Sequence, residues 1–156
     1  MDPMGGSDSP DAAWRSRVTR PHDVAELQTL IEVTALRKLA DRGLTDEELD
    51  TSRRLARATV RSARGGDLTG YLEADATFHL YLLGLTGHPA VADVARLLPG
   101  TRAAQLRTVG ERAQRMEIGA GEHGEIVALL ADDMVSAASE MLRRHVAADL
   151  TGPDEA

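Results

Sequence analysis

The chain has 156 residues, 18 basic and 25 acidic side chains, a formal net charge of −7 and no cysteine. Its length suits one domain, and an apolar share of 42% argues against wholesale disorder. The lack of cysteine excludes disulfide frameworks, thiolate metal sites and cysteine nucleophiles. The acidic balance and the four aromatic residues argue against nucleic-acid binding by this chain. No apolar run approaches membrane-spanning length, so we expect a cytoplasmic protein.

Apolar residues recur with the helical period along most of the chain, and no segment alternates as a strand does. Residues 1–20 are predicted to be a disordered leader or an expression remnant, and residues 151–156 a frayed tail. Residues 21–150 are predicted to form one all-α domain, an antiparallel bundle of about six helices with a metal site in its core.

The predicted helices are bounded by capping and breaking residues. The first helix should start at Asp23 as its N-cap, and the second at Thr45, where Glu48 completes a capping box. The expected spans are 23–43, 45–65, 67–87, 89–109 with a kink or break at 99–100, 116–131 and 133–150.

Four polar residues fall within the apolar stripes of these helices. Asp75 and His79 lie one turn apart on the third helix, His123 lies on the fifth, and His145 lies near Met134 on the inward face of the sixth. The turn between the last two helices places the two histidines within one helical turn in height, so their imidazoles can face each other.

Each of these residues alone has a structural explanation, because a core histidine can bond a backbone carbonyl and an Asp–His pair can bond internally. Three histidines and an aspartate on three facing helices are harder to explain separately. Nitrogen and oxygen ligands from facing helices are typical of metal sites in bundles, so we predict a divalent metal. His22 and His88 are predicted to be solvated or capping residues.

Around these residues the chain resembles the FCD domain, the effector-binding domain of FadR-type transcription regulators in the GntR superfamily. The resemblance rests on three segments: AELQTLIEVTALRKLA, GDLTGYLEADATFHLYLLGLTGHP and GEHGEIVALLADDMVSAASEMLRRHV. It implies that Asp75, His79, His123 and His145 are metal ligands. Zinc is favoured, and nickel, manganese, cobalt and iron remain open. Six helices resemble the VanR-like subgroup.

The resemblance also implies a small carboxylate effector bound at the metal, and a homodimer. Arg102 and Gln28 are the candidate effector contacts, although many relatives have an arginine where this chain has Gln28. Leu80, on the polar side of its helix, favours a dimer interface. Residues 1–20 are too few for the winged helix-turn-helix of these regulators, so we expect either a truncated regulator or a stand-alone sensor.

Two other functions compete with the sensor. An open His₃Asp site could serve a metal-dependent hydrolase, although no further glutamate or histidine is predicted on the same inward faces to act as general base. A metal-stabilised dimerisation module without an effector is the other alternative. The sensor, which is not an enzyme, is the function that the sequence favours.

Overall fold

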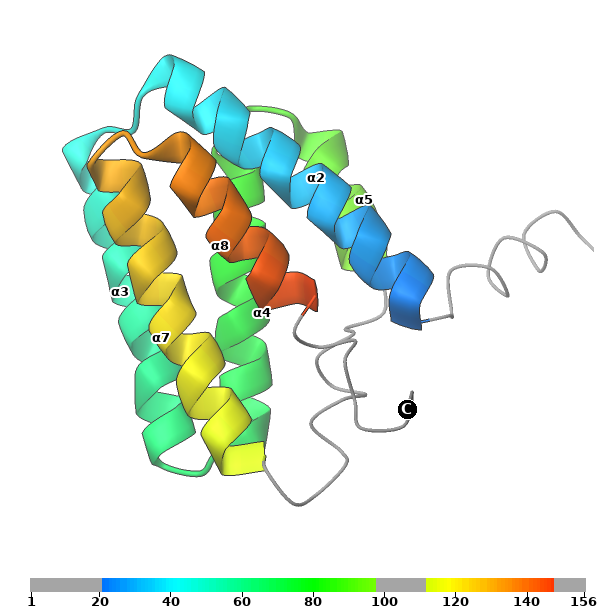
Figure 1. Cartoon of the computed structure of the whole chain (residues 1–156), viewed down its shortest axis with the longest axis vertical. Coiled ribbons are helices and arrows are strands. Elements are labelled where there is room, and N and C mark those ends of the chain that lie inside the picture. Colours follow the sequence, from blue (N-terminus) through cyan, green and yellow to red (C-terminus); the bar gives the residue numbers. More distant parts are fainter. Residues whose placement is uncertain (1–20, 98–111, 148–156) are drawn as a thin grey trace, which may run out of the picture.

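The computed structural model describes residues 21–97 and 112–147, and these residues form helices joined by short turns (Figure 1). The helices in this part of the chain are α2 (Pro21–Arg42), α3 (Asp46–Arg64), α4 (Leu68–Gly84), α5 (Pro89–Leu97), α7 (Arg112–Ala131) and α8 (Val135–Ala147). The predicted all-α bundle of about six helices is therefore confirmed. The predicted leader, the tail, the kink at 99–100 and Arg102 lie outside the described residues.

Five of the six described helices close into a ring. Helix α2 packs on α8, α8 on α7, α7 on α3, α3 on α4, and α4 returns to α2, while α5 packs outside the ring against α4 and α2. In Figure 1, α3 and α8 run downward and α2, α4 and α7 run upward. Neighbours in the ring are thus antiparallel except α2 and α4, because a ring with an odd number of members cannot alternate throughout.

Local sequence determines the ends of several helices. Thr45 and Glu48 form the predicted capping box at the start of α3. Helix α7 ends with Asp133 in the left-handed region at φ 58°, where Met134 N–H bonds Leu129 O and Asp133 N–H bonds Leu130 O. This Schellman-type ending reverses the chain into α8.

Two predicted starts are wrong by a few residues. Helix α2 already includes Pro21 and His22, so Asp23 lies within the helix and is not its N-cap. Helix α7 begins at Arg112 and not near Met116, since the intervening residues are good helix formers.

Apolar side chains fill the ring in two clusters. The larger includes Phe78 of α4 and Ile126 of α7, and the smaller includes Tyr71 and Met116 of the same two helices. Met134, predicted to face inward, is 51% exposed, because it lies in the turn before α8 begins. Along both α4 and α7, a short polar stretch separates the two clusters, and this layer contains the candidate site. No helix within 21–97 and 112–147 is long and apolar enough to cross a membrane.

Candidate metal centre

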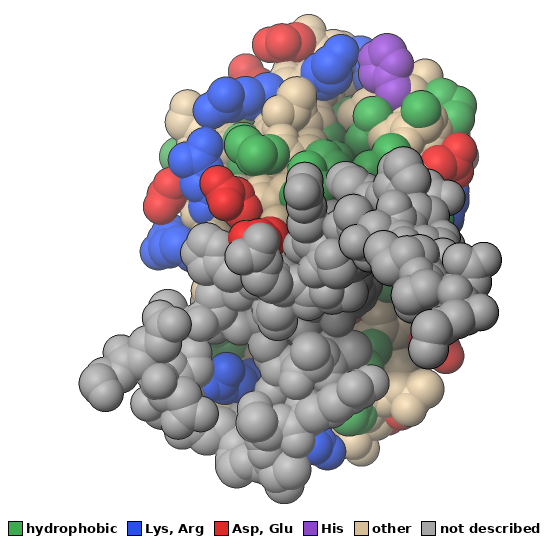
Figure 2. All heavy atoms as spheres, turned by 90° about the vertical axis from the view of Figure 1, so that its right-hand side faces the viewer, with side chains coloured by type: hydrophobic (Ala, Val, Ile, Leu, Met, Phe, Trp, Pro, Cys, Tyr) green, Lys and Arg blue, Asp and Glu red, His purple; other side chains and the backbone are tan. Residues whose placement is uncertain are grey.

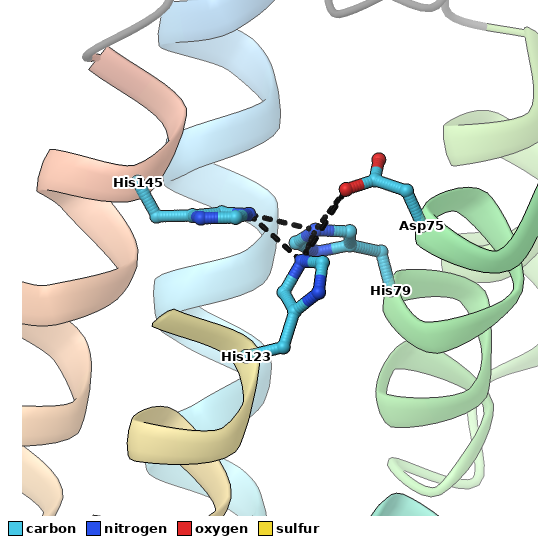
Figure 3. Close-up of side chains that lie close together, drawn as sticks. All are labelled: Asp75, His79, His123 and His145. Carbon is cyan, nitrogen blue, oxygen red and sulfur yellow. Dashed lines mark hydrogen bonds and ion pairs between the residues drawn. The ribbon is translucent and has the colours of Figure 1, made fainter. Parts of the chain in front are cut away.

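The four residues selected from the sequence converge in the middle of the ring (Figure 3). Asp75 and His79 come from α4, His123 from α7 and His145 from α8, and all four residues are buried. One potential ligand atom from each lies within 4.8 Å of the others. The predicted His₃Asp cluster is therefore present in the core, and its residues come from three helices of the ring.

The three imidazoles face one another with their Nε2 atoms. The Nε2 atoms of His123 and His145 are 3.0 Å apart, those of His79 and His145 3.2 Å, and those of His79 and His123 3.3 Å. Two nitrogens bound to one metal at about 2.0–2.1 Å would be about 3.0 Å apart at a right angle and about 3.4 Å apart at the tetrahedral angle. The spacing therefore fits three ligands of a single ion.

Asp75 completes the cluster on the α4 side. Its Oδ1 lies 3.3 Å from Nε2 of His123 and 3.9 Å from Nε2 of His79, and its other oxygen points away from the imidazoles in Figure 3. Its side chain is 11% exposed, whereas those of His123 and His145 are fully buried. The carboxylate thus lies at the more accessible edge of the cluster.

The far nitrogen of each imidazole contacts a different helix. Nδ1 of His79 lies 2.6 Å from Oε2 of Glu32 on α2, and Nδ1 of His145 lies 2.7 Å from Oε2 of Glu122 on α7. Nδ1 of His123 lies 3.1 Å from Oγ1 of Thr59 on α3. Every helix of the ring therefore contributes at least one side chain to the cluster or to its partners.

These contacts favour one tautomer for each imidazole. An ionised carboxylate only accepts hydrogen bonds, so His79 and His145 donate from Nδ1 to their glutamates. The Thr59 hydroxyl donates to the carbonyl of Ala56 at 2.7 Å, so its oxygen accepts from Nδ1 of His123. In a neutral imidazole the other nitrogen then carries a lone pair. Three Nε2 lone pairs and a carboxylate oxygen face one another, an arrangement that a cation stabilises.

Phe78 forms an apolar wall of the centre. Its ring centroid lies 4.4 Å from that of His123 and 5.4 Å from that of His79, and the side chain is fully buried. An apolar wall restricts water on this side and strengthens the electrostatic interactions of the polar groups beside it.

The sequence analysis missed Glu32, Thr59 and Glu122. The prediction that no further glutamate shares the inward faces of the cluster residues did not consider α2, where Glu32 is only 5% exposed. A signal was present in the pattern of α2, where Glu32 is spaced by four residues from Leu36 in a buried stripe. Thr59 and Glu122 could not be distinguished from residues with purely local roles.

The remaining predicted residues lie outside the cluster. Gln28 lies on α2 and donates from Nε2 to Oε1 of Glu32 at 2.8 Å, and the other oxygen of that carboxylate contacts Nδ1 of His79. His88 is exposed, 3.4 Å from Nζ of Lys38, which agrees with a solvated residue. The side chain of His22 lies outside the part of the structure that is described, as does Arg102.

A separate groove runs between α2 and α5. Its volume is about 450 Å³, and its lining includes Leu30, Ile31, Val91 and Val94, with Lys38 and His88 also lining it. Figure 2 shows apolar side chains gathered on this face beside a histidine. Leu30 and Val94 are 62% and 42% exposed, so apolar side chains are open to solvent on this face.

A family model described as the FCD domain matches residues 23–148, a span that contains all four residues of the cluster. Comparison with curated proteins and comparison with solved structures each found no match.

Proposed function

The chain belongs to the FCD domain family, and on that premise we propose that it senses a small carboxylate metabolite through a bound divalent metal. FCD domains are the effector-binding domains of GntR-family transcription regulators. The observation that carries the proposal is the convergence of three imidazole Nε2 atoms and a buried carboxylate within 4.8 Å. The VanR-like subgroup stays part of the proposal on the sequence resemblance.

Asp75, His79, His123 and His145 would hold the metal. Their three nitrogens and one oxygen suit zinc, nickel, cobalt, iron or manganese, and zinc is favoured by the number of imidazoles. When bound, the ion supplies positive charge and open coordination positions, which an effector carboxylate can fill. The chain itself orients the imidazoles and excludes water with Phe78.

The effector is a small organic acid in this proposal. Its entry is expected on the side of Asp75, where the cluster is least enclosed. Gln28 and Arg102 stay proposed as effector contacts. Gln28 supports this role only indirectly, since its amide is hydrogen-bonded to Glu32 one turn away on α2.

Homodimerisation is part of the proposal because the FCD resemblance implies it. Leu80 is half-buried, so it lends less support to an exposed interface than the sequence pattern did. A mass in light scattering of twice 16.7 kDa at tens of micromolar would support the dimer. A strictly monomeric mass would contradict it.

The hydrolase alternative gains little from the glutamates that the sequence analysis missed. Both carboxylate oxygens of Glu32 accept hydrogen bonds, from His79 and Gln28, and Glu122 accepts from His145. A general base needs a carboxylate available to the reacting water. Turnover of an ester panel that His123→Ala abolishes would favour the hydrolase.

Titration of metal-free protein with zinc, followed by citrate, tests the sensor. We expect one zinc per chain, and citrate should raise the melting temperature of zinc-loaded protein more than that of metal-free protein. The same citrate shift with and without zinc would contradict a metal-bound carboxylate. Zinc binding with no response to a broad panel of organic acids would favour the dimerisation module without effector.

A further inference from the structure

Each imidazole of the centre has a partner on its far nitrogen, and the three partners come from three helices. Glu32 lies on α2, Thr59 on α3 and Glu122 on α7. Helices α2 and α3 contribute no residue to the His₃Asp cluster itself. Their contact with the cluster passes through Glu32 and Thr59.

We propose that Glu32, Thr59 and Glu122 are positioning residues that hold the three imidazoles in the tautomer whose Nε2 lone pair faces the metal. The inference deepens the proposed function and rests on it for the metal itself. If Glu32 and Thr59 position the ligands, α2 and α3 are part of the metal centre. Metal binding then stabilises all five helices of the ring.

The Glu32–His79 contact carries the most weight. The Nδ1 to Oε2 distance is 2.6 Å, both side chains are at most 7% exposed, and the hydrogen bond spans 47 residues of sequence. Charge-assisted hydrogen bonds of this kind are short and strong, especially away from water. The second oxygen of Glu32 accepts from Gln28, which fixes the carboxylate in its turn.

Glu122 and His123 are neighbours in sequence but have different roles, because Glu122 contacts the imidazole of His145 and His123 contributes its own imidazole to the cluster. His123 directs its Nε2 into the centre, while Glu122 accepts from Nδ1 of His145 on the facing helix. Two contacts therefore join α7 and α8 at this layer, His123 with His145 and Glu122 with His145. Glu122 is 22% exposed, so solvent can replace part of its effect, and its loss should cost less than the loss of Glu32.

A free imidazole interconverts between its two tautomers, and only one of them presents a lone pair from Nε2. An acceptor on Nδ1 selects that tautomer and the ring orientation, and raises the basicity of the ligand. Removal of such a partner lowers metal affinity by about 10–100-fold in known metal sites. A residue that only fills space would change neither the tautomer nor the affinity of a folded variant.

The test compares Glu32→Ala, Glu32→Gln and Glu122→Ala with two matched controls, Glu26→Gln on α2 and Glu125→Gln on α7, which are both exposed. Zinc affinity is measured by competition with a chromophoric chelator. We expect a loss of about 10–100-fold for Glu32→Ala, a smaller loss for Glu122→Ala, and wild-type affinity for both controls. Glu32→Gln should fall between wild type and Glu32→Ala, because its amide oxygen still accepts from Nδ1.

A second readout needs no metal. Imidazole ¹⁵N shifts of metal-free protein at about pH 8.5, above the ordinary range of histidine titration, report the tautomer of each ring. We expect the Nδ1–H tautomer for His79 in wild type and in Glu32→Gln, and a mixture in Glu32→Ala. Wild-type tautomers and zinc affinity in folded Glu32→Ala would overturn the inference while leaving the metal proposal intact. A wild-type chain that binds no zinc would instead refute the proposed function. The ¹⁵N shifts of the metal-free protein would still test whether Glu32 selects the tautomer of His79.

Discussion

Two polar networks in this molecule use the same kinds of side chain in opposite settings. One is the surface network of Arg42, Thr45 and Glu48 at the junction of α2 and α3, where all the hydrogen bonds between these three join residues at most six apart in sequence. The other is the buried centre, where the contacts of the three histidines with one another and with Glu32, Thr59 and Glu122 span 22 to 66 residues. The surface network fixes a helix end, and the buried one fixes how five helices pack.

The setting decides what each network contributes. An exposed ion pair is screened by water and is worth about 0–1 kcal/mol. A buried polar group that loses its partner costs about 1–3 kcal/mol, and more when it is charged. Substitutions of the four residues of the centre and their three partners should therefore change the stability and the ligand response of the domain most. Substitutions in the surface network should change both very little.

The largest effect is expected from removing a residue of the cluster. His123→Ala and His145→Ala should each abolish the rise in melting temperature that zinc produces, because Nε2 of each histidine lies within 3.3 Å of both others. The exposed His88 supplies the control, and His88→Ala should respond to zinc as wild type does. An undiminished zinc response in His123→Ala would refute the site.

Metal removal should give the next largest effect. The proposed ligands come from α4, α7 and α8, so an ion present at 100 times its dissociation constant adds about 2.7 kcal/mol to the free energy of unfolding. For a domain of this size that corresponds to about 5–10 °C in melting temperature, measured by circular dichroism before and after chelation. No shift in a sample shown to be metal-loaded would contradict the metal's role.

Thr59→Val should act at the same layer with a smaller effect. The substitution keeps the shape of the side chain but removes the acceptor for Nδ1 of His123, which is buried. We expect the free energy of unfolding to fall by about 1–3 kcal/mol in chemical denaturation, and zinc affinity to fall with it. Thr59→Ser keeps the hydroxyl and should stay close to wild type. Equal losses in both variants would point to packing and not to the hydrogen bond.

Changes to the surface network should have the smallest effects. Thr45→Ala removes the cap of α3 and should lower the free energy of unfolding by about 1 kcal/mol, with no change in zinc affinity.

The guanidinium of Arg42 and the backbone of Thr45 hold the pKa of Glu48 below its ordinary value of 4.5. The stabilisation by Glu48 is therefore complete above that value and is lost as pH falls through the lowered pKa. The difference in stability between wild type and Glu48→Gln should shrink on acidification below pH 4.5. A difference that stays constant there would contradict this assignment.

The same contrast explains what the sequence could predict. The capping box needs only Thr45 and Glu48, three residues apart, and it was predicted correctly. The four residues of the cluster were also found, because a polar residue within an apolar helical stripe stands out and the family resemblance links the three helices. Glu32 forms part of such a stripe too, but nothing local shows that it faces a histidine 47 residues away.

Other residues escaped prediction for a different physical reason. Thr59 bonds the carbonyl of Ala56, as threonines within helices commonly do, and its contact with His123 exists only once α3 packs against α7. Met134 lies in the turn before α8, where the helical period that predicts its inward face does not apply. Errors thus concentrate where tertiary packing or a helix end overrides the local period.

The metal content of protein purified without chelator or nickel resin tests the central claim most directly. Elemental analysis of wild type and of His123→Ala, purified side by side, should find close to one equivalent of a divalent transition metal per wild-type chain and a small fraction of that in the variant. Wild-type protein that contains no metal, and takes up none when zinc is added, would contradict the account.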